Sequence, residues 1–251
     1  MTTLPRFSIE SLTERQIAKA IDHSLLRPEL DNAFVEDGCR LAAEYDVASV
    51  CVPPVHVARA QAILAGTDVA VGTVVGFPHG YATTETKVAE TRQALAHGAT
   101  EIDMVLQIGA LKSGRDADVE TDIRAVVDAA HAGGAIVKVI FENHYLTDDE
   151  KVRACQLTEA AGAEFVKTST GFAASGATHD DLRLMREHTS PHIQVKAAGG
   201  VRTLDALIEV MNLGVTRIGA TQTKAIIDDF RARKAGALAV PATAGASESG
   251  Y

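Results

Sequence analysis

The chain has 251 residues, of which 46% are hydrophobic, and it carries a formal net charge of −9. This length and apolar content are enough for one large α/β domain or two small ones. The negative charge, without any Lys/Arg cluster, argues against a nucleic-acid-binding surface, and no apolar run approaches the roughly 18 residues that a membrane span needs.

Three cysteines, Cys39, Cys51 and Cys155, lie far apart in the sequence and form no CxxC pair. This pattern is typical of small buried thiols in a reducing compartment, and it disfavours a disulfide framework or a zinc site. Residues 1–6 contain no apolar signal-peptide core. We therefore expect a cytoplasmic protein that uses no metal and no cofactor, and that binds neither nucleic acid nor membrane.

The first half of the chain alternates short apolar runs with amphipathic stretches. Residues 1–10 are predicted to form a loose arm, and Ser11 with Glu14 is a possible capping box that opens a short helix. Helices are expected to begin at Asp31 or Asn32, at Pro54 and at Thr84. The strand-like runs between them cover residues 20–25, 48–52, 69–76 and 102–106.

The second half repeats the same alternation. Its strand-like runs cover residues 136–142, 165–172, 193–200 and 215–220. Amphipathic patterns predict helices around residues 119–130, from Thr147 with Glu150 as a capping box, from Thr178, over residues 204–211, and from about Thr223 to Lys234. Residues 235–251 are small and polar, which indicates a flexible tail.

The count is eight strand–helix units without a long linker. Strict alternation with short crossovers implies a parallel sheet, and eight units in about 220 residues close naturally into a (β/α)₈ barrel, the TIM-barrel class of α/β fold. The alternative is an open doubly wound sheet, which is disfavoured because no GxGxxG or P-loop follows the first strand. We expect a single domain over residues 1–234 that includes the arm and the first helix.

Three late strands carry a lysine in the middle of an apolar run: Lys138, Lys167 and Lys196. Solvated edge strands would explain one such lysine, but a buried lysine requires a partner or a task. Two lysines on adjacent strands with few carboxylates nearby are expected to lower each other's pKa. A neutral lysine amine attacks carbonyls and forms a Schiff base.

Other polar residues also fall within or at the ends of the predicted strands. Asp22, Asp103 and Glu142 are expected to face the three lysines, and Cys51 belongs to the same group of positions. Ion pairs that merely fill the barrel core are the structural alternative. A carboxylic acid beside a Schiff base can shuttle protons during the formation or cleavage of a carbon–carbon bond.

Glycines gather where the late strands end. Gly171, Gly199, Gly200 and Gly219 occupy three consecutive strand exits. Each glycine alone is ordinary turn chemistry. Together they indicate a phosphate site, because the last strands of such barrels commonly bind phosphate through backbone N–H groups and a helix N-terminus.

Eight stretches closely resemble the deoxyribose-phosphate aldolase family of class I aldolases: residues 21–26, 49–54, 76–80, 101–105, 138–142, 166–171, 195–203 and 217–220. The resemblance implies reversible cleavage of 2-deoxy-D-ribose 5-phosphate to D-glyceraldehyde 3-phosphate and acetaldehyde. It also implies that Lys167 forms the Schiff base, that Lys196 lowers the pKa of Lys167, and that Asp103 relays protons. Small aldehydes and sugar phosphates are then the expected partners, and family members often form homodimers.

The chain departs from the family where the phosphate is expected. The exit of the eighth strand reads Thr221-Gln222-Thr223 instead of a run of small residues. We assign substrate or phosphate binding to Asp22, Cys51, Gly171, Gly199, Gly200, Gly219, Thr221 and Gln222. A Schiff-base aldolase for unphosphorylated or longer aldehydes and a non-catalytic sugar-phosphate-binding barrel remain alternatives.

The last residue of the chain is a tyrosine in the predicted tail. Some members of the resembled family also end in tyrosine, and a coil of about seventeen residues averages roughly 20 Å end to end. Tyr251 is therefore a fourth predicted catalytic residue, whose phenol would assist proton transfer beside Asp103.

Overall fold

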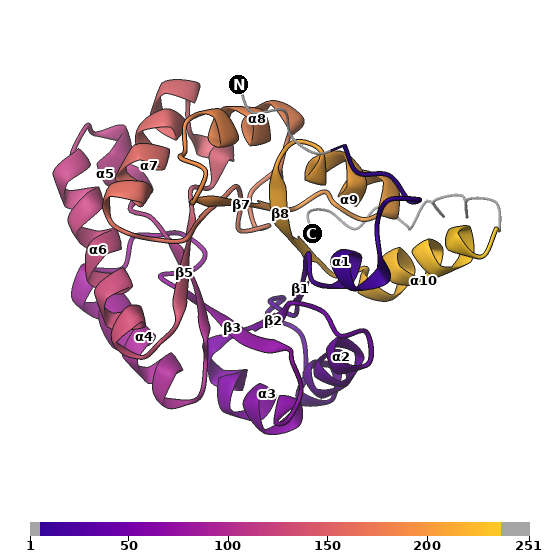
Figure 1. The fold of residues 1–251 in the computed structure, drawn as a ribbon. Helices are drawn as coiled ribbons and strands as arrows, with labels where there is room; N and C mark the ends of the chain where they lie inside the picture. Colours follow the sequence, from indigo (N-terminus) through magenta and orange to yellow (C-terminus); the bar gives the residue numbers. More distant parts are fainter. Residues whose placement is uncertain (1–5, 237–251) are drawn as a thin grey trace.

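The protein is a closed barrel of eight parallel strands surrounded by helices (Figure 1). The computed structural model describes residues 6–236. Each strand pairs with the next, and β1 pairs with β8 to close the ring. The predicted TIM barrel is therefore confirmed. The strands are Ile21–Ser24 (β1), Ser49–Val52 (β2), Ala70–Val75 (β3), Glu101–Val105 (β4), Ile136–Ile140 (β5), Phe165–Lys167 (β6), Gln194–Ala198 (β7) and Val215–Ala220 (β8).

The helices form an outer ring in Figure 1, and α1 lies beside α10, the last helix. They are Glu14–Ala18 (α1), Asn32–Glu44 (α2), Val57–Leu64 (α3), Thr84–Ala96 (α4), Ile108–Lys112 (α5), Asp116–Ala132 (α6), Asp148–Ala160 (α7), His179–Glu187 (α8), Leu204–Met211 (α9) and Thr223–Lys234 (α10), with short 3₁₀ turns at Pro54–His56 (η1) and Asn143–Tyr145 (η2). None of the helices in residues 6–236 has the length and apolar character needed to cross a membrane.

Of the two predicted helix capping boxes, the structure confirms one and corrects the other. The box predicted at Ser11 and Glu14 is wrong, because α1 is capped two residues later by Thr13 and Gln16. Thr13 accepts a hydrogen bond from the Gln16 N–H, and the Gln16 side chain accepts one from the Thr13 N–H. The box at Thr147 and Glu150 is confirmed at the start of α7.

Two further predictions concern the chain end. The tail that we placed at residues 235–251 falls almost entirely outside the described residues, and Tyr251 lies there as well. Its flexibility, its catalytic role and the domain limits drawn around it stay predictions.

The hydrophobic core fills the layer between the strands and the helices. Strand residues that point outward, such as Val50, Ile102 and Val166, are fully buried in this layer. The three cysteines are buried as well, as predicted. Because successive strand residues alternate sides, the apolar outward face leaves every second position free to point into the barrel, where the charged residues lie.

One buried ion pair lies outside the barrel, between α4 and α6. Lys87 Nζ is 2.6 Å from Asp122 Oδ2 and donates to the Val105 carbonyl at 2.8 Å, and both side chains of the pair are fully buried. The contact anchors the end of β4 from outside. It thereby fixes the strand that carries Asp103.

Candidate active site

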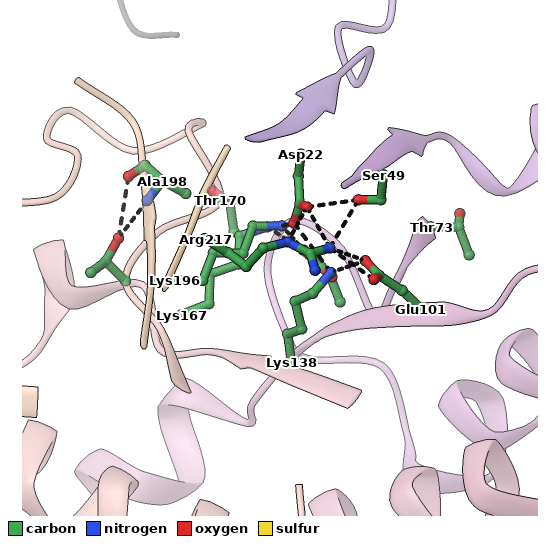
Figure 2. Close-up of polar contacts among 12 residues, drawn as sticks. Asp22, Ser49, Thr73, Glu101, Lys138, Lys167, Thr170, Lys196, Ala198 and Arg217 are labelled. Carbon is green, nitrogen blue, oxygen red and sulfur yellow. Dashed lines mark hydrogen bonds and ion pairs between the residues drawn. The ribbon is translucent and has the colours of Figure 1, made fainter. Parts of the chain in front are cut away.

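Three lysines project into the barrel from three consecutive strands. Lys138 lies on β5, Lys167 on β6 and Lys196 on β7, and Lys167 is the register partner of Lys196. All three are at most 3% exposed. Figure 2 shows their side chains converging on the barrel axis. The prediction that these lysines have buried partners, and do not sit on solvated edges, is confirmed.

Asp103 of β4 is the common partner of the three lysines. Its Oδ2 lies 2.7 Å from Lys167 Nζ and 2.7 Å from Lys196 Nζ, and its Oδ1 lies 3.0 Å from Lys138 Nζ. Burial by itself would raise the pKa of Asp103, but the three ammonium groups hold that pKa well below its usual value. Asp103 is therefore an ionised carboxylate that accepts a hydrogen bond from the Lys167 amine.

A second group of charges lies around this centre. Asp22 Oδ2 of β1 is 2.5 Å from Lys196 Nζ, and Glu101 Oε2 of β4 is 2.6 Å from Lys138 Nζ. Arg217 of β8 joins them, with Nη2 at 2.6 Å from Asp22 Oδ1 and 2.7 Å from Glu101 Oε2 (Figure 2). We call the connected set the interior network: Asp22, Glu101, Asp103, Lys138, Lys167, Lys196 and Arg217.

The sequence-based reasoning missed Glu101 and Arg217. The missing signal was period-2 alternation: Glu101 is two residues before Asp103, so both point to the same side of β4. Arg217 likewise alternates with Gly219 on β8, and Gly219 faces the cavity described below.

The lysines differ in how many carboxylates they meet. Burial lowers the pKa of Lys167, and the charge of Lys196 lowers it further, against the opposing pull of Asp103. Burial also acts on Lys196, but Asp103 and Asp22 outweigh it and raise the pKa of Lys196. The expectation that two lysines with few carboxylate neighbours lower each other's pKa is therefore wrong for Lys196. The lowering falls on Lys167 alone.

Glu142 forms no ion pair with the three lysines among the described residues, contrary to our prediction, although the charge of Lys167 reaches its carboxyl. In the described part of the chain its carboxylate accepts hydrogen bonds from the backbone N–H and the hydroxyl of Thr170, whereas the lysines pair with Asp22, Glu101 and Asp103. Its backbone is left-handed, with φ 55°, a conformation that few residues other than glycine adopt. Burial raises the pKa of this carboxyl. Glu142 thus ties the exit of β5 to the exit of β6.

A small cavity opens at the carboxyl ends of the strands, next to Lys167 and Lys196. Its lining consists of Asp22, Ser24, Leu26, Cys51, Lys167, Thr170, Lys196, Ala198, Gly199 and Gly219. Four of the predicted substrate-binding residues are in this lining. Burial raises the pKa of Cys51 to about 11, so the thiol is neutral there.

The other predicted phosphate-binding residues lie at the neighbouring strand exits. Gly171 and Gly200 directly follow lining residues and have positive φ angles of 89° and 96°. Thr221 and Gln222 connect β8 to α10 and are exposed. The structure therefore brings the exits of β6, β7 and β8 side by side.

The chain matches a known protein family over most of its length. Residues 16–240 match the family described as DeoC/LacD family aldolase. A protein of Geobacillus sp. (strain WCH70) named deoxyribose-phosphate aldolase is 52% identical over 215 residues, which cover 86% of this chain and 96% of the relative. A protein of Alkaliphilus oremlandii with the same name is 51% identical over 220 residues, 88% of this chain and 99% of the relative.

A solved structure has a similar overall fold. The deoxyribose phosphate aldolase of Aeropyrum pernix superposes with a TM-score of 0.83 at 28% identity, covering 90% of this chain and 95% of the other. That protein is described as having a unique tetrameric structure.

Proposed function

Because the chain belongs to the DeoC/LacD aldolase family, we propose that it cleaves 2-deoxy-D-ribose 5-phosphate reversibly into D-glyceraldehyde 3-phosphate and acetaldehyde. The observation that carries the proposal is the Lys167 amine, which lines the cavity 2.7 Å from Asp103 and has a lowered pKa. Such an amine is a nucleophile for an aldehyde carbonyl. Asp103 supplies a proton acceptor beside this amine, and Lys196 supplies a fixed positive charge.

The proposed chemistry runs through a Schiff base on Lys167. The neutral amine adds to the carbonyl carbon of the sugar, and loss of water from the carbinolamine gives the protonated imine. Loss of the proton from the sugar's C3 hydroxyl to a base, together with cleavage of the C2–C3 bond, releases the phosphorylated aldehyde and leaves an enamine. Protonation of the enamine carbon and hydrolysis then release acetaldehyde and restore the amine.

Asp103 and Lys196 have separate tasks in this scheme. Asp103 touches the Lys167 amine and carries protons during carbinolamine and enamine steps. Lys196 holds Asp103 in place through its own hydrogen bond and disfavours a second ammonium at Lys167. The raised pKa of Lys196 supports its role as a permanent charge.

Reductive trapping tests the proposal directly. The protein is treated with acetaldehyde and borohydride, digested and analysed by mass spectrometry. We expect one ethyl group, on Lys167. An adduct on Lys138 or Lys196 would assign the nucleophile elsewhere, and no adduct at all would favour the non-catalytic sugar-phosphate-binding barrel. Turnover of a panel of phosphorylated and unphosphorylated aldehydes separates this aldolase from one with another substrate.

Phosphate binding is proposed at the exits of β6, β7 and β8. Gly171, Gly199, Gly200 and Gly219 can present backbone N–H groups there, and α10 begins at Thr223 immediately beyond. The helix N-terminus favours an anion. Thr221 and Gln222 lie between the last strand and this helix, so they belong to the proposed site.

Gln222→Ser is expected to strengthen phosphate binding. Gln222 precedes α10 and its side chain caps no N–H of that helix, so serine, which is smaller, would lose no capping hydrogen bond there. We expect a lower KM for 2-deoxyribose 5-phosphate and little change for free 2-deoxyribose. Gln194→Ser is a matched control, because Gln194 begins β7 at the opposite end of the barrel. Equal changes for both substrates would remove Gln222 from the phosphate site.

Three further assignments rest on the sequence. We propose that Tyr251 assists proton transfer, that Asp22 and Cys51 contact the substrate, and that the protein is a cytoplasmic homodimer. The place of Asp22 and Cys51 in the cavity lining supports their assignment. Sedimentation measures the assembly state, and deletion of Tyr251 followed by methyl-proton exchange in acetaldehyde measures its contribution.

A further inference from the structure

The interior network is not neutral when all of its groups are ionised. In residues 6–236, its ion pairs connect four cations with three carboxylates, which leaves one positive charge in excess. The lysines and carboxylates of the network are at most 7% exposed, and the Arg217 side chain is 14% exposed. An uncompensated charge is costly in such surroundings, and loss of a proton relieves it.

Contacts decide which group gives up the proton. Lys138 lies within 3.2 Å of carboxylates from three residues, and Lys196 meets two. Arg217 also meets two and remains protonated in proteins. Among the residues that the structure describes, Lys167 forms an ion pair with Asp103 alone, and it shares that carboxylate oxygen with Lys196. The excess charge is therefore removed at Lys167.

Four members of the network, Glu101, Asp103, Lys138 and Arg217, do not line the cavity, and Arg217 and Glu101 also make no ion pair with Lys167 or Lys196 among the described residues. Arg217 Nη2 contacts both oxygens of Glu101, at 2.8 and 2.7 Å, and the guanidinium lies 5.9 Å from the centre of the Phe165 ring. Neither Arg217 nor Glu101 is in the cavity lining. Contact with a substrate therefore does not explain why this pair is charged.

We propose that Arg217 and Glu101 are positioning residues that set the charge balance of the barrel interior and thereby keep Lys167 a neutral amine. Each acts by its charge on the whole network, through Lys138 and Asp22, and not by contact with the substrate. The inference rests on the proposed function only in taking Lys167 as the nucleophile.

The charged and titratable groups around Lys167 come from four directions. Asp103 of β4 favours the ammonium, Lys196 of β7 opposes it, and Cys51 of β2 is a neutral thiol. Glu142, after β5, interacts with Lys167 by charge and binds Thr170. None of these contacts is altered directly by a change at the Arg217–Glu101 pair.

The pair itself is also surrounded by charge. Arg217 faces Asp22 of β1, Glu101 of β4 and Lys138 of β5, while Glu101 faces Lys138 and Arg217. Ser49 of β2 donates to Asp22 and accepts from Arg217. A change at either member alters the charge next to Lys138 and Asp22, which lead to Lys196 and Asp103.

The test compares two substitutions that break the same ion pair with opposite effects on charge. Glu101→Gln adds one positive charge to the balance, so the pKa of Lys167 should fall. Arg217→Gln removes one, so that pKa should rise. We expect shifts of about one unit in each direction. The double variant restores the original excess and should return the pKa toward its original value.

Two readouts follow the Lys167 pKa. If the protein turns over substrate, the acid limb of the pH profile of kcat/KM reports the Lys167 pKa. The pH dependence of Lys167 modification by methyl acetimidate, measured by peptide mass spectrometry, reports it without any catalysis, because only the neutral amine reacts. If turnover is absent but the two variants shift the acetimidate profile in opposite directions, the proposed function fails and this inference stands.

Matched variants separate charge from packing. Arg217→Lys keeps the positive charge but loses the contact with both oxygens of Glu101. This variant should leave the Lys167 pKa unchanged. Glu120→Gln removes a charge on the exposed face of α6, where water screens it, and should also have no effect. If Arg217→Gln does not fold, Glu101→Gln and the double variant must still differ. Shifts in the same direction in both single variants, or none, would overturn the proposal.

Discussion

Lys167→Ala is expected to reduce turnover by a factor on the order of 10⁴ or more while the barrel stays folded. The substitution removes the only amine of the interior network that the charge balance leaves neutral. Lys196 keeps both carboxylate partners, and Asp103 keeps Lys138 and Lys196. Three cations then face three carboxylates, so the charges of the described interior network balance in the variant.

Steady-state kinetics with 2-deoxyribose 5-phosphate measure the loss of turnover. Thermal denaturation shows whether the barrel stays folded. Lys112→Ala is the control, because Lys112 is an exposed lysine on α5 and its removal should not change turnover. Substantial turnover in Lys167→Ala, or trapping of acetaldehyde by another lysine in that variant, would show that the Schiff base forms elsewhere.

Asp103→Asn is expected to slow turnover by about 10²-fold or more, the usual range for a general acid–base group. Asparagine keeps the shape but has no proton to exchange. Since the carboxylate favours the Lys167 ammonium, its loss also lowers the pKa of Lys167. The acid limb of the pH–rate profile should therefore move to lower pH at the same time as the maximum rate drops.

Exchange of the acetaldehyde methyl protons with deuterated water, followed by NMR, isolates the proton relay from the cleavage step. We expect slow exchange in Asp103→Asn together with unchanged borohydride trapping at Lys167. Exchange at the rate of the unaltered protein would assign the relay to another group. A general loss of folding is recognised separately, since it abolishes trapping as well.

The same substitution changes how stability depends on pH. The folded pKa of Asp103 lies well below its usual value, so its carboxylate stabilises the folded state at pH values above about 4. This stabilisation is lost as the pH falls through the folded pKa. Asp103→Asn should therefore be less stable than the unaltered protein at neutral pH, because the buried lysines lose a partner, and the difference should shrink in acid.

The barrel was predictable because its signals are repeated and local. Eight apolar runs at regular spacing give the strands, and side-chain caps such as Asp31, Thr147 and Thr178 give helix starts. A lysine in mid-strand is an equally local signal, since burying it requires compensation. Lys138, Lys167, Asp103 and their mutual contacts could therefore be expected before any coordinates.

The remaining features depend on which residues meet across the barrel. Arg217 and Glu101 resemble ordinary charged residues near strand ends, and only the register of the closed sheet brings them together. The left-handed backbone of Glu142 turns its carboxylate to Thr170, which no spacing rule indicates. The sign of the Lys196 shift likewise follows from the number of carboxylates around it, which is a property of the three-dimensional arrangement.

The charges inside the barrel are divided between the two parts of the chain. Among the described residues of the interior network, the carboxylates belong to β1 and β4, and the cations belong to β5, β6, β7 and β8. The part of the chain before β5 supplies only the anions of this network, and the part from β5 onward supplies only its cations. Within the network, each set of charges repels itself and attracts the other, so closure of the barrel, with β1 beside β8 and β4 beside β5, compensates both sets. The cations of β5 to β8 thus compensate the carboxylates of β1 and β4.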